Sequence, residues 1–343
     1  MYYAVERAKT IRNELERRSI LKTIPLDSWQ FKEGFYVTPK EAHSAPAPFV
    51  PFTCGRDVWG GADKHAWFYT HTMLPPLDAE TAVSLHLSSG HGTWDAIHAQ
   101  MLVFFNGEAV QGSDLNHQDI FFSGQAGNVE IDIQSHSGRC TEPQLFVAEL
   151  RVFDLRVREL YYDLALAIEV AQVVADDDLQ RTRLDAALTE AVNLLDLRAP
   201  GSSAYYLSIE SAHRCLTQSL FTKDDSIRGA VCSCIGHTHI DIAWWWTVAQ
   251  TREKAVRSFA TVLKLMEEYP QYKFMSSQPI LYEMVKERYP DLYEKIRTRV
   301  REGRWEPEGG MWVEADCNLA SGESLVRQFI YGKQFFRDEF GKE

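Results

Sequence analysis

The sequence has no long hydrophobic run and few cysteines, and each absence excludes a class of protein. A membrane-spanning helix needs about 18 or more consecutive apolar residues, and the 343-residue chain has no such stretch. Its six cysteines are scattered, without C-x-x-C spacing or the density of a disulfide-bonded domain. Residues 1–18 are charged and lack the apolar segment of a secretory signal. We therefore expect a cytoplasmic protein that does not associate with membranes.

Basic residues are also fewer than acidic residues. The chain has 36 Lys and Arg against 48 Asp and Glu, a formal net charge of −12. Nucleic acids and anionic membrane surfaces are bound by clustered Lys and Arg that replace counterions. We therefore expect no nucleic-acid partner, and the hydrophobic content of 45% is that of an ordinary globular protein.

The hydrophobic pattern changes along the chain and divides it into segments. We expect an N-terminal helical segment at residues 1–24. Residues 25–155 contain short alternating runs broken by turn residues, and the pair Asn106-Gly107 is typical of a hairpin. This pattern predicts an antiparallel β-sandwich. In residues 156–225, apolar residues recur at intervals of three and four residues. This spacing predicts a connector of three helices.

Strands and helices alternate in the last segment, residues 226–343. We predict a buried strand at 230–235, a second at 273–277, and a third from Arg304 toward Val313, each followed by helix. Such alternation is typical of a parallel sheet with functional groups at the carboxyl ends of its strands. Because three parallel strands leave both edges of the sheet open, we expect this segment to be the start of a larger domain.

A cluster of metal-ligand residue types follows the first of these strands. Residues 236–241 are Gly-His-Thr-His-Ile-Asp. In extended backbone, residues two apart point to the same side, so His237, His239 and Asp241 share a face. Imidazole and carboxylate groups suit a divalent cation such as zinc. The alternative is a hydrogen-bonded polar cluster without metal, which we consider weaker because burying polar groups is costly.

Three tryptophans follow directly, at positions 244, 245 and 246. An indole face can stack on the apolar face of a sugar ring, but it can equally pack inside a domain. We assign Trp244, which lies closest to Asp241, to a sugar pocket.

Four carboxylates lie in and after the third strand, at Glu306, Glu308, Glu314 and Asp316. Glycosidases act with two carboxylates about an anomeric carbon, and one of them is a nucleophile in retaining enzymes. We interpret Glu306 and Glu308 as solvated loop charges. Asp316 is the candidate for chemistry because it lies just past the strand, and Glu314 is its rival in the same block.

Together these blocks resemble family 38 of the glycoside hydrolases, the retaining α-mannosidases with a zinc-type metal site, and in particular their cytosolic and bacterial branch. The family pattern H-x-H-x-D occurs at 237–241, and G-G-x-W-V-x-x-D-x-N occurs at 309–318. Residues 303–306 and 322–328 also look like that branch, and 106–117 resembles its N-terminal β-domain. The resemblance covers nearly all of the chain.

The resemblance implies a role for each matched residue. His239 and Asp241 would be metal ligands, and Asp316 would be both a ligand and the catalytic nucleophile. We therefore expect these three side chains to converge at one end of the sheet. Trp244 would pack at the metal-side sugar position. His237 matches a position that is not usually a direct ligand, and it would lie just behind the ligands.

The resemblance also implies a substrate and an architecture. The substrate would be an oligosaccharide with a terminal α-linked mannose, two hydroxyls of which the metal would hold. The fold would be multidomain, with the β-sandwich, the helical connector and the first three βα units of an incomplete (β/α)7-type barrel. The family's fourth ligand and its general acid come from much later in the chain than Asp316. We therefore expect this chain to be an N-terminal fragment that is inactive alone.

Two other interpretations stay open. A metal-dependent amidohydrolase or deacetylase can also carry H-x-H at a strand end, although residues 312–316 and the Trp triplet speak against it. A non-catalytic carbohydrate-binding module is the other, although His239, Asp241 and Asp316 are all intact. The sequence does not determine the linkage preference, the natural glycan, the metal or whether the full-length protein is a homo-oligomer.

Overall fold

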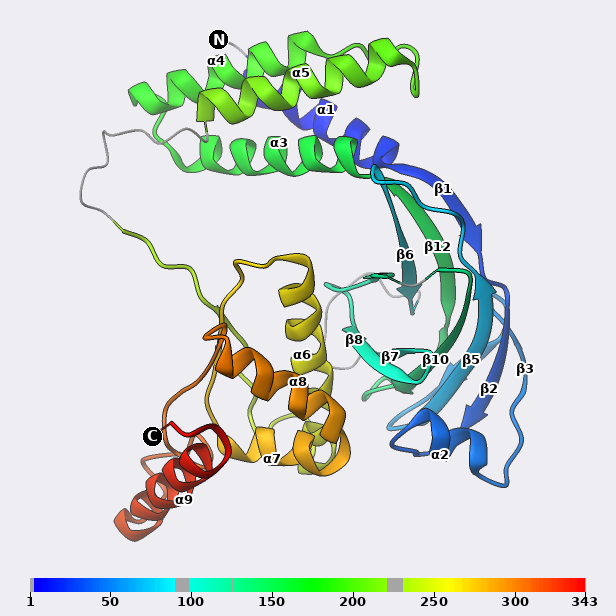
Figure 1. Cartoon of the computed structure of the whole chain (residues 1–343), viewed down its shortest axis with the longest axis vertical. Coiled ribbons are helices and arrows are strands. Elements are labelled where there is room, and N and C mark those ends of the chain that lie inside the picture. Colours follow the sequence, from blue (N-terminus) through cyan, green and yellow to red (C-terminus); the bar gives the residue numbers. More distant parts are fainter. Residues whose placement is uncertain (1–2, 90–98, 125, 221–230, 343) are drawn as a thin grey trace.

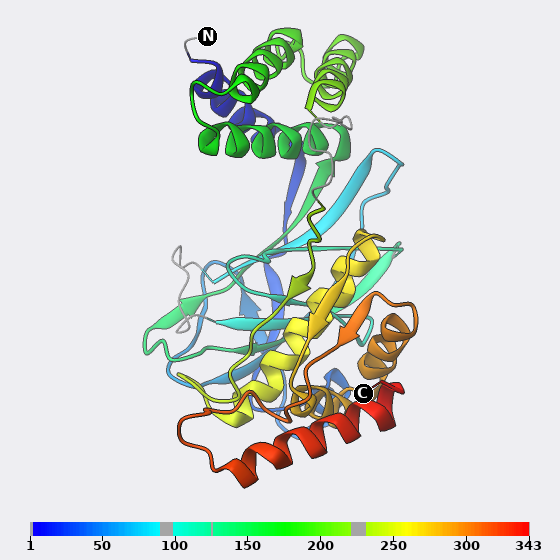
Figure 2. The ribbon, with the colours of Figure 1, turned by 90° about the vertical axis from the view of Figure 1, so that its left-hand side faces the viewer.

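The structure, a computed structural model, describes residues 3–89, 99–124, 126–220 and 231–342. Within these ranges the chain forms a β-sandwich, a helical bundle and a small parallel sheet with helices around it (Figure 1). The bundle stands at one end of the molecule, and the parallel sheet lies beside the sandwich (Figure 2). No described helix combines the length and the apolar character needed to cross a membrane.

The β-sandwich consists of two antiparallel sheets, with the strand orders β1-β12-β6-β9 and β3-β2-β5-β10-β7-β8. The first contains β1 (Ile20–Pro25), β6 (Thr81–Ser88), β9 (Asp119–Phe121) and β12 (Val147–Asp154). The second contains β2 (Ser28–Glu33), β3 (Val50–Thr53), β5 (His65–Met73), β7 (Gln100–Phe105), β8 (Glu108–Ser113) and β10 (Asn128–His136). A short pair, β4 (Val58–Gly60) and β11 (Pro143–Leu145), and the helix α2 (Pro39–Ser44) complete this part.

Side chains from both sheets fill one core, which includes Leu85 of β6 and Ile131 of β10. The predicted antiparallel arrangement is therefore confirmed. The Asn106-Gly107 turn between β7 and β8 has positive φ angles of 51° and 84°, as a two-residue hairpin of this type requires. The sheet also begins earlier than expected, since β1 pairs with β12 from Ile20 within the segment predicted to be helical.

The helical bundle combines the N-terminal helix with the connector. It contains α1 (Ala4–Ser19), α3 (Leu155–Val173), α4 (Leu179–Leu194) and α5 (Ser203–Leu220). Leu15, Leu160, Leu188 and Ile209, one from each helix, lie in its core. Asp154 ends β12 and caps α3, so the bundle continues directly from the sandwich.

The last part contains a parallel sheet of order β13-β14-β15. Its elements are β13 (Gly236–His237), α6 (Val248–Glu268), β14 (Phe274–Ser276), α7 (Pro279–Arg288), α8 (Pro290–Arg301), β15 (Trp305–Pro307) and α9 (Gly322–Phe340). The predicted alternation of strand and helix is confirmed. Three parallel strands do not by themselves make a barrel, which stays a prediction.

The first strand of this sheet lies later than the sequence predicts. Residues 231–235 are exposed and belong to no strand, and residue 230 lies outside the described residues. Before β14 the chain turns, with the Tyr272 amide bonded to the Tyr269 carbonyl at 2.9 Å. The apolar run at 231–235 therefore finds no partner in β14, whose pairing on that side is limited to the two residues of β13.

The third strand is shorter than predicted. It ends at Pro307 and does not run toward Val313. Proline has no backbone N–H to donate to a neighbouring strand. Two residues later, the φ of 80° at Gly309 ends the extended backbone. The residues after 307 are therefore a loop.

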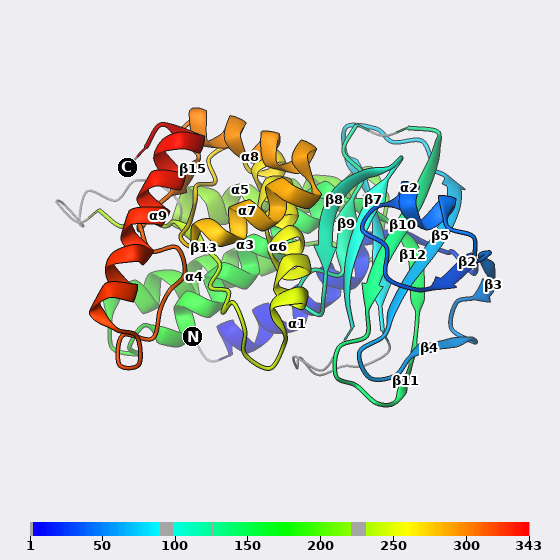
Figure 3. The ribbon, with the colours of Figure 1, turned by 90° about the horizontal axis from the view of Figure 1, so that it is seen from below.

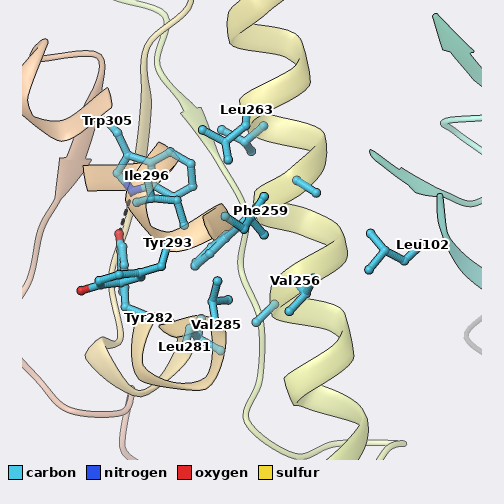
Figure 4. Packing of buried hydrophobic residues seen from close by; sticks show 14 of the residues in the cluster. Leu102, Val256, Phe259, Leu263, Leu281, Tyr282, Val285, Tyr293, Ile296 and Trp305 are labelled. Carbon is cyan, nitrogen blue, oxygen red and sulfur yellow. Dashed lines mark hydrogen bonds between the residues drawn. The ribbon is translucent and has the colours of Figure 1, made fainter. Parts of the chain in front are cut away.

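One hydrophobic core joins the parallel sheet to the sandwich. Phe259 of α6, Tyr282 of α7 and Trp305 of β15 are fully buried in it, and Leu102 of β7 belongs to the same cluster (Figure 4). The Trp305 Nε1 donates to the Tyr282 hydroxyl at 2.9 Å, and that hydroxyl donates to the Ser276 carbonyl at 2.8 Å. These contacts hold α6 and α7 against the strands whose ends carry the candidate site.

Candidate functional site

Apart from His237, which ends β13, the predicted site residues lie on loops that follow the parallel strands. Figure 3 shows β13 and β15 with the helices α7, α8 and α9 around them. Residues 238–246 follow β13, Ser277 and Gln278 follow β14, and residues 308–321 follow β15. All three loops leave the carboxyl ends of the strands, where parallel sheets gather functional groups.

His239 joins two of these loops. Its Nε2 lies 3.3 Å from Asp241 Oδ1, and its Nδ1 lies 3.1 Å from Glu314 Oε2. The other oxygen of Glu314 accepts a hydrogen bond of 2.5 Å from the Ser277 hydroxyl. The side chains of His239, Asp241 and Glu314 are 59%, 37% and 41% exposed, so a ligand from solvent can reach them.

The loop after β15 is held by α9. The Trp312 amide donates to the Gln328 carbonyl at 3.0 Å, and the Val313 amide donates to the Gln328 side-chain oxygen at 2.8 Å. These bonds fix the backbone immediately before Glu314.

Two glycines allow α9 to approach that loop. A Cβ on Gly332 would lie 2.0 Å from the Gly310 carbonyl oxygen, and a Cβ on Gly310 would lie 3.1 Å from the Lys333 side chain. A side chain at position 332 would therefore clash with the backbone of the loop, whereas one at position 310 would require the Lys333 side chain to shift. The two glycines at 309–310 therefore have different reasons. Gly310 packs closely against α9, and Gly309 adopts a positive φ.

The loop after β13 is held by the first turns of α6. Thr251 donates from its hydroxyl to the Ile242 carbonyl at 2.6 Å, and Trp246 donates from Nε1 to the Asp241 carbonyl at 3.2 Å. Thr247 and Gln250 form a capping box that starts the helix. Trp246 is therefore the tryptophan of the triplet that anchors the loop backbone.

Asp316 is exposed and does not touch the His239 pair. Its Oδ1 accepts from the backbone amides of Asn318 at 2.8 Å and Leu319 at 3.3 Å, which closes a turn. The rival carboxylate, Glu314, makes the contact with His239. The role implied for Asp316 stays a prediction.

The two remaining sequence candidates lie at the rim of the site. His237 Nδ1 lies 3.2 Å from the Met275 carbonyl on the neighbouring strand. Trp244 is 67% exposed, so its indole is open to a ligand.

The donor types present suit a divalent metal, but of the three predicted ligands only His239 and Asp241 are paired. The imidazole of His239 and the carboxylate of Asp241 are N and O donors of the kind that zinc uses. Among the described residues, no group of three or more His, Cys, Asp or Glu is arranged to hold a metal ion. The metal set therefore stays a prediction.

A cavity of about 350 Å³ adjoins His239 and reaches the β-sandwich. His237, His239 and Trp246 line one side of it, and Asp114 and His117 of the sandwich line another. The carboxylate of Asp114 raises the pKa of His117 by hydrogen bonding to its ring. No sequence pattern predicts that residues of the sandwich lie beside the site.

Lys254 of α6 also lines this cavity. Burial, and then the positive charge of Arg257, lower its pKa to about 8. Its Nζ lies 4.2 Å from the centre of the Trp246 ring. No sequence motif marks Lys254, because it is a single lysine in an amphipathic helix.

Comparison with known proteins finds similarity to one family of glycosyl hydrolases. The model of the Glycosyl hydrolases family 38 N-terminal domain matches residues 230–343. Alpha-mannosidase G of Dictyostelium discoideum is 33% identical over 276 residues, which are 74% of this chain and 25% of that protein. Alpha-mannosidase 2C1 of Homo sapiens is 37% identical over 199 residues, 58% of this chain and 18% of that protein. The chain thus spans a quarter or less of the length of these relatives.

Similarity to solved structures is weak. A Ruminococcus gnavus beta-glucuronidase aligns with a TM-score of 0.25 and 12% identity, over 38% of this chain and 28% of that one. A similarity of this size supports no argument.

Proposed function

We propose that the chain is part of a retaining α-mannosidase of glycosyl hydrolase family 38, and the match of residues 230–343 to the N-terminal domain of that family supports this proposal. Its substrate would be an oligosaccharide with a terminal α-linked mannose. The observation that carries the proposal is the contact of His239 with both Asp241 and Glu314. This contact brings the H-x-H-x-D block and the carboxylate block together at one end of the parallel sheet.

Asp316 is the proposed nucleophile. A carboxylate oxygen of Asp316 would bond to the anomeric carbon while the glycosidic C–O bond breaks and the leaving oxygen takes a proton from a general acid. Water would then release the mannose from Asp316. The carboxylate is exposed, and its Oδ1 is oriented by two backbone amides.

We propose one divalent metal ion, zinc, held by His239, Asp241 and Asp316. The adjacent N and O donors of His239 and Asp241 support this assignment. When bound, zinc would hold hydroxyls of the terminal mannose and favour distortion of its ring. The exposed indole of Trp244 would stack on that sugar, and His237 would lie behind the ligands.

The proposal also concerns what these 343 residues do alone. They span a quarter or less of the length of the α-mannosidases that they match. We propose that the rest of such a protein completes the site, so that the 343-residue polypeptide by itself does not hydrolyse α-mannosides. We also propose a cytoplasmic location, which is supported by six cysteines that form no disulfide.

Hydrolysis of aryl glycosides tests the function. A full-length protein containing this chain should release the aryl group from an α-mannoside, with retained configuration in the first sugar product. It should not act on the matching β-mannoside. Chelation should abolish turnover, and added zinc should restore it. Cleavage of an N-acetyl substrate without α-mannoside turnover would favour the amidohydrolase interpretation instead.

A further inference from the structure

Gln278 occupies an unusual position between the loops of the site. It lies directly after Ser277 at the end of β14 and is 3% exposed. Its φ of 62° and ψ of 82° place a residue other than glycine in the left-handed region, immediately before Pro279. Such a backbone costs free energy and persists only where the surrounding contacts determine it.

Two hydrogen bonds of the Gln278 side-chain amide, one from its nitrogen and one to its oxygen, hold this backbone in place. Its Nε2 donates to the Ile240 carbonyl at 2.9 Å, and its Oε1 accepts from the Glu314 backbone amide at 3.2 Å. Ile240 stands between His239 and Asp241 in the sequence. A single buried side chain on the middle strand thus bonds to the loop of the first strand and to the loop of the third.

We propose that Gln278 is a positioning residue, which sets the 314–316 segment relative to the His239–Asp241 pair. Both of its backbone partners adjoin site residues, and the neighbouring Ser277 binds the Glu314 carboxylate itself. The consequence for catalysis rests on the function proposed above, whereas the consequence for loop order does not.

Isosteric substitution separates the two hydrogen bonds. Gln278→Met keeps the length of the side chain and leaves the Ile240 carbonyl and the Glu314 amide without partners. Gln278→Glu can still accept from the Glu314 amide but cannot donate to Ile240 when ionised. Gln278→Gly suits the left-handed backbone and removes only the side chain, so it remains informative if the Met variant fails to fold.

A matched control comes from the β-sandwich. Gln144 is fully buried, and its Nε2 donates to the Ser137 carbonyl at 3.0 Å. Gln144→Met therefore also loses a buried amide hydrogen bond, but one that joins neither of the two site loops.

The first readout is hydrogen exchange of the 343-residue chain by mass spectrometry. Gln278→Met and Gln278→Gly should each speed exchange at least tenfold in peptides 238–246 and 310–316, whereas Gln144→Met should change neither. Unchanged exchange in either peptide of the Gln278 variants would overturn the proposal.

The second readout is kinetic and uses the full-length protein. Gln278→Met should lower kcat for an aryl α-mannoside at least tenfold and change KM less than threefold, and Gln278→Glu should give an intermediate loss. An equal loss of kcat in Gln144→Met would overturn the positioning role. If the wild type shows no α-mannoside turnover, the proposed function fails, and the exchange experiment still decides the role of Gln278.

Discussion

His239 Nδ1 lies 3.1 Å from Glu314 Oε2, although 75 positions separate the two residues in the sequence. The same imidazole contacts Asp241 through its other nitrogen. Of the two carboxylates in the 314–316 segment, Glu314 therefore touches the imidazole, and Asp316 lies on the adjoining turn. Which of these two carboxylates reacts with substrate is the first question for experiment.

We predict that Asp316→Asn lowers kcat of the full-length protein by about 10³-fold or more, because an amide is not a usable nucleophile. The substitution should leave the fold intact. An Asn oxygen can still accept from the Asn318 and Leu319 amides that Asp316 binds. Steady-state kinetics and thermal unfolding of the same preparation separate the two effects.

Covalent trapping then distinguishes Asp316 from Glu314. A slow fluorosugar substrate should label Asp316, and the labelled peptide can be identified by mass spectrometry. Glu314→Gln should still be labelled at Asp316. A label on Glu314, or full activity of Asp316→Asn, would reverse the assignment.

Zinc binding gives the second prediction. His239→Ala should weaken the binding of Zn²⁺ to the full-length protein by more than about a hundredfold, because it removes a direct ligand. His213→Ala is the control, since His213 also faces a carboxylate, Asp163, at 3.0 Å but lies in the helical bundle. Isothermal titration with Zn²⁺ measures both. Equal affinity in wild type and His239→Ala would remove His239 from the metal site.

Much of the fold could be predicted because its signals are local. The alternation in the sandwich and the Asn106-Gly107 turn both depend on neighbouring residues, and both are confirmed. The strand predicted at 230–235 was wrong because strand formation needs a partner at the right register. No local pattern contains that information.

The same distinction between local signals and contacts set by the fold applies to the candidate site. His239 and Asp241 lie two residues apart, and their contact follows from that spacing. The contact of His239 with Glu314 depends on how α9 and Gln278 place a distant loop. Gln278 could have been noticed as a polar residue between a strand and Pro279, but only the fold shows what its amide binds.

The glycine contact between α9 and the site loop gives the third prediction. Gly332→Ala would place a Cβ 2.0 Å from the Gly310 carbonyl oxygen, so α9 or the loop must move. Overpacking of this kind costs about 1–3 kcal/mol of stability. Gly322→Ala, at the start of the same helix, meets no atom within 4 Å and should change stability by less than about 1 kcal/mol. Urea unfolding measures both variants, and an equal effect would contradict the close approach.

The last prediction concerns Glu253, which fixes α6 to the sandwich. Its carboxylate lies 2.9 Å from His65 Nε2 on β5 and 3.5 Å from Arg257 Nη1, and its side chain is only 7% exposed. Burial alone would raise the pKa of Glu253, but the bond to His65 and the charge of Arg257 outweigh burial and hold it below the ordinary value of 4.5. Since folding lowers this pKa, the ionised carboxylate stabilises the fold above about pH 4.5.

That stabilisation should be lost as the pH falls from 4.5 through the pKa of the folded state. Glu253→Gln should cost about 3–5 kcal/mol at pH 7, because Arg257 then stays buried with its countercharge removed. Urea unfolding at pH 7, 5, 4 and 3 should show the wild type and the variant converging at the acidic end. Glu287→Gln is the control, since Glu287 pairs with Arg252 at 2.5 Å on the surface and should cost less than about 1 kcal/mol. A gap between wild type and Glu253→Gln that stays constant down to pH 3 would show that the lost charge is not its cause.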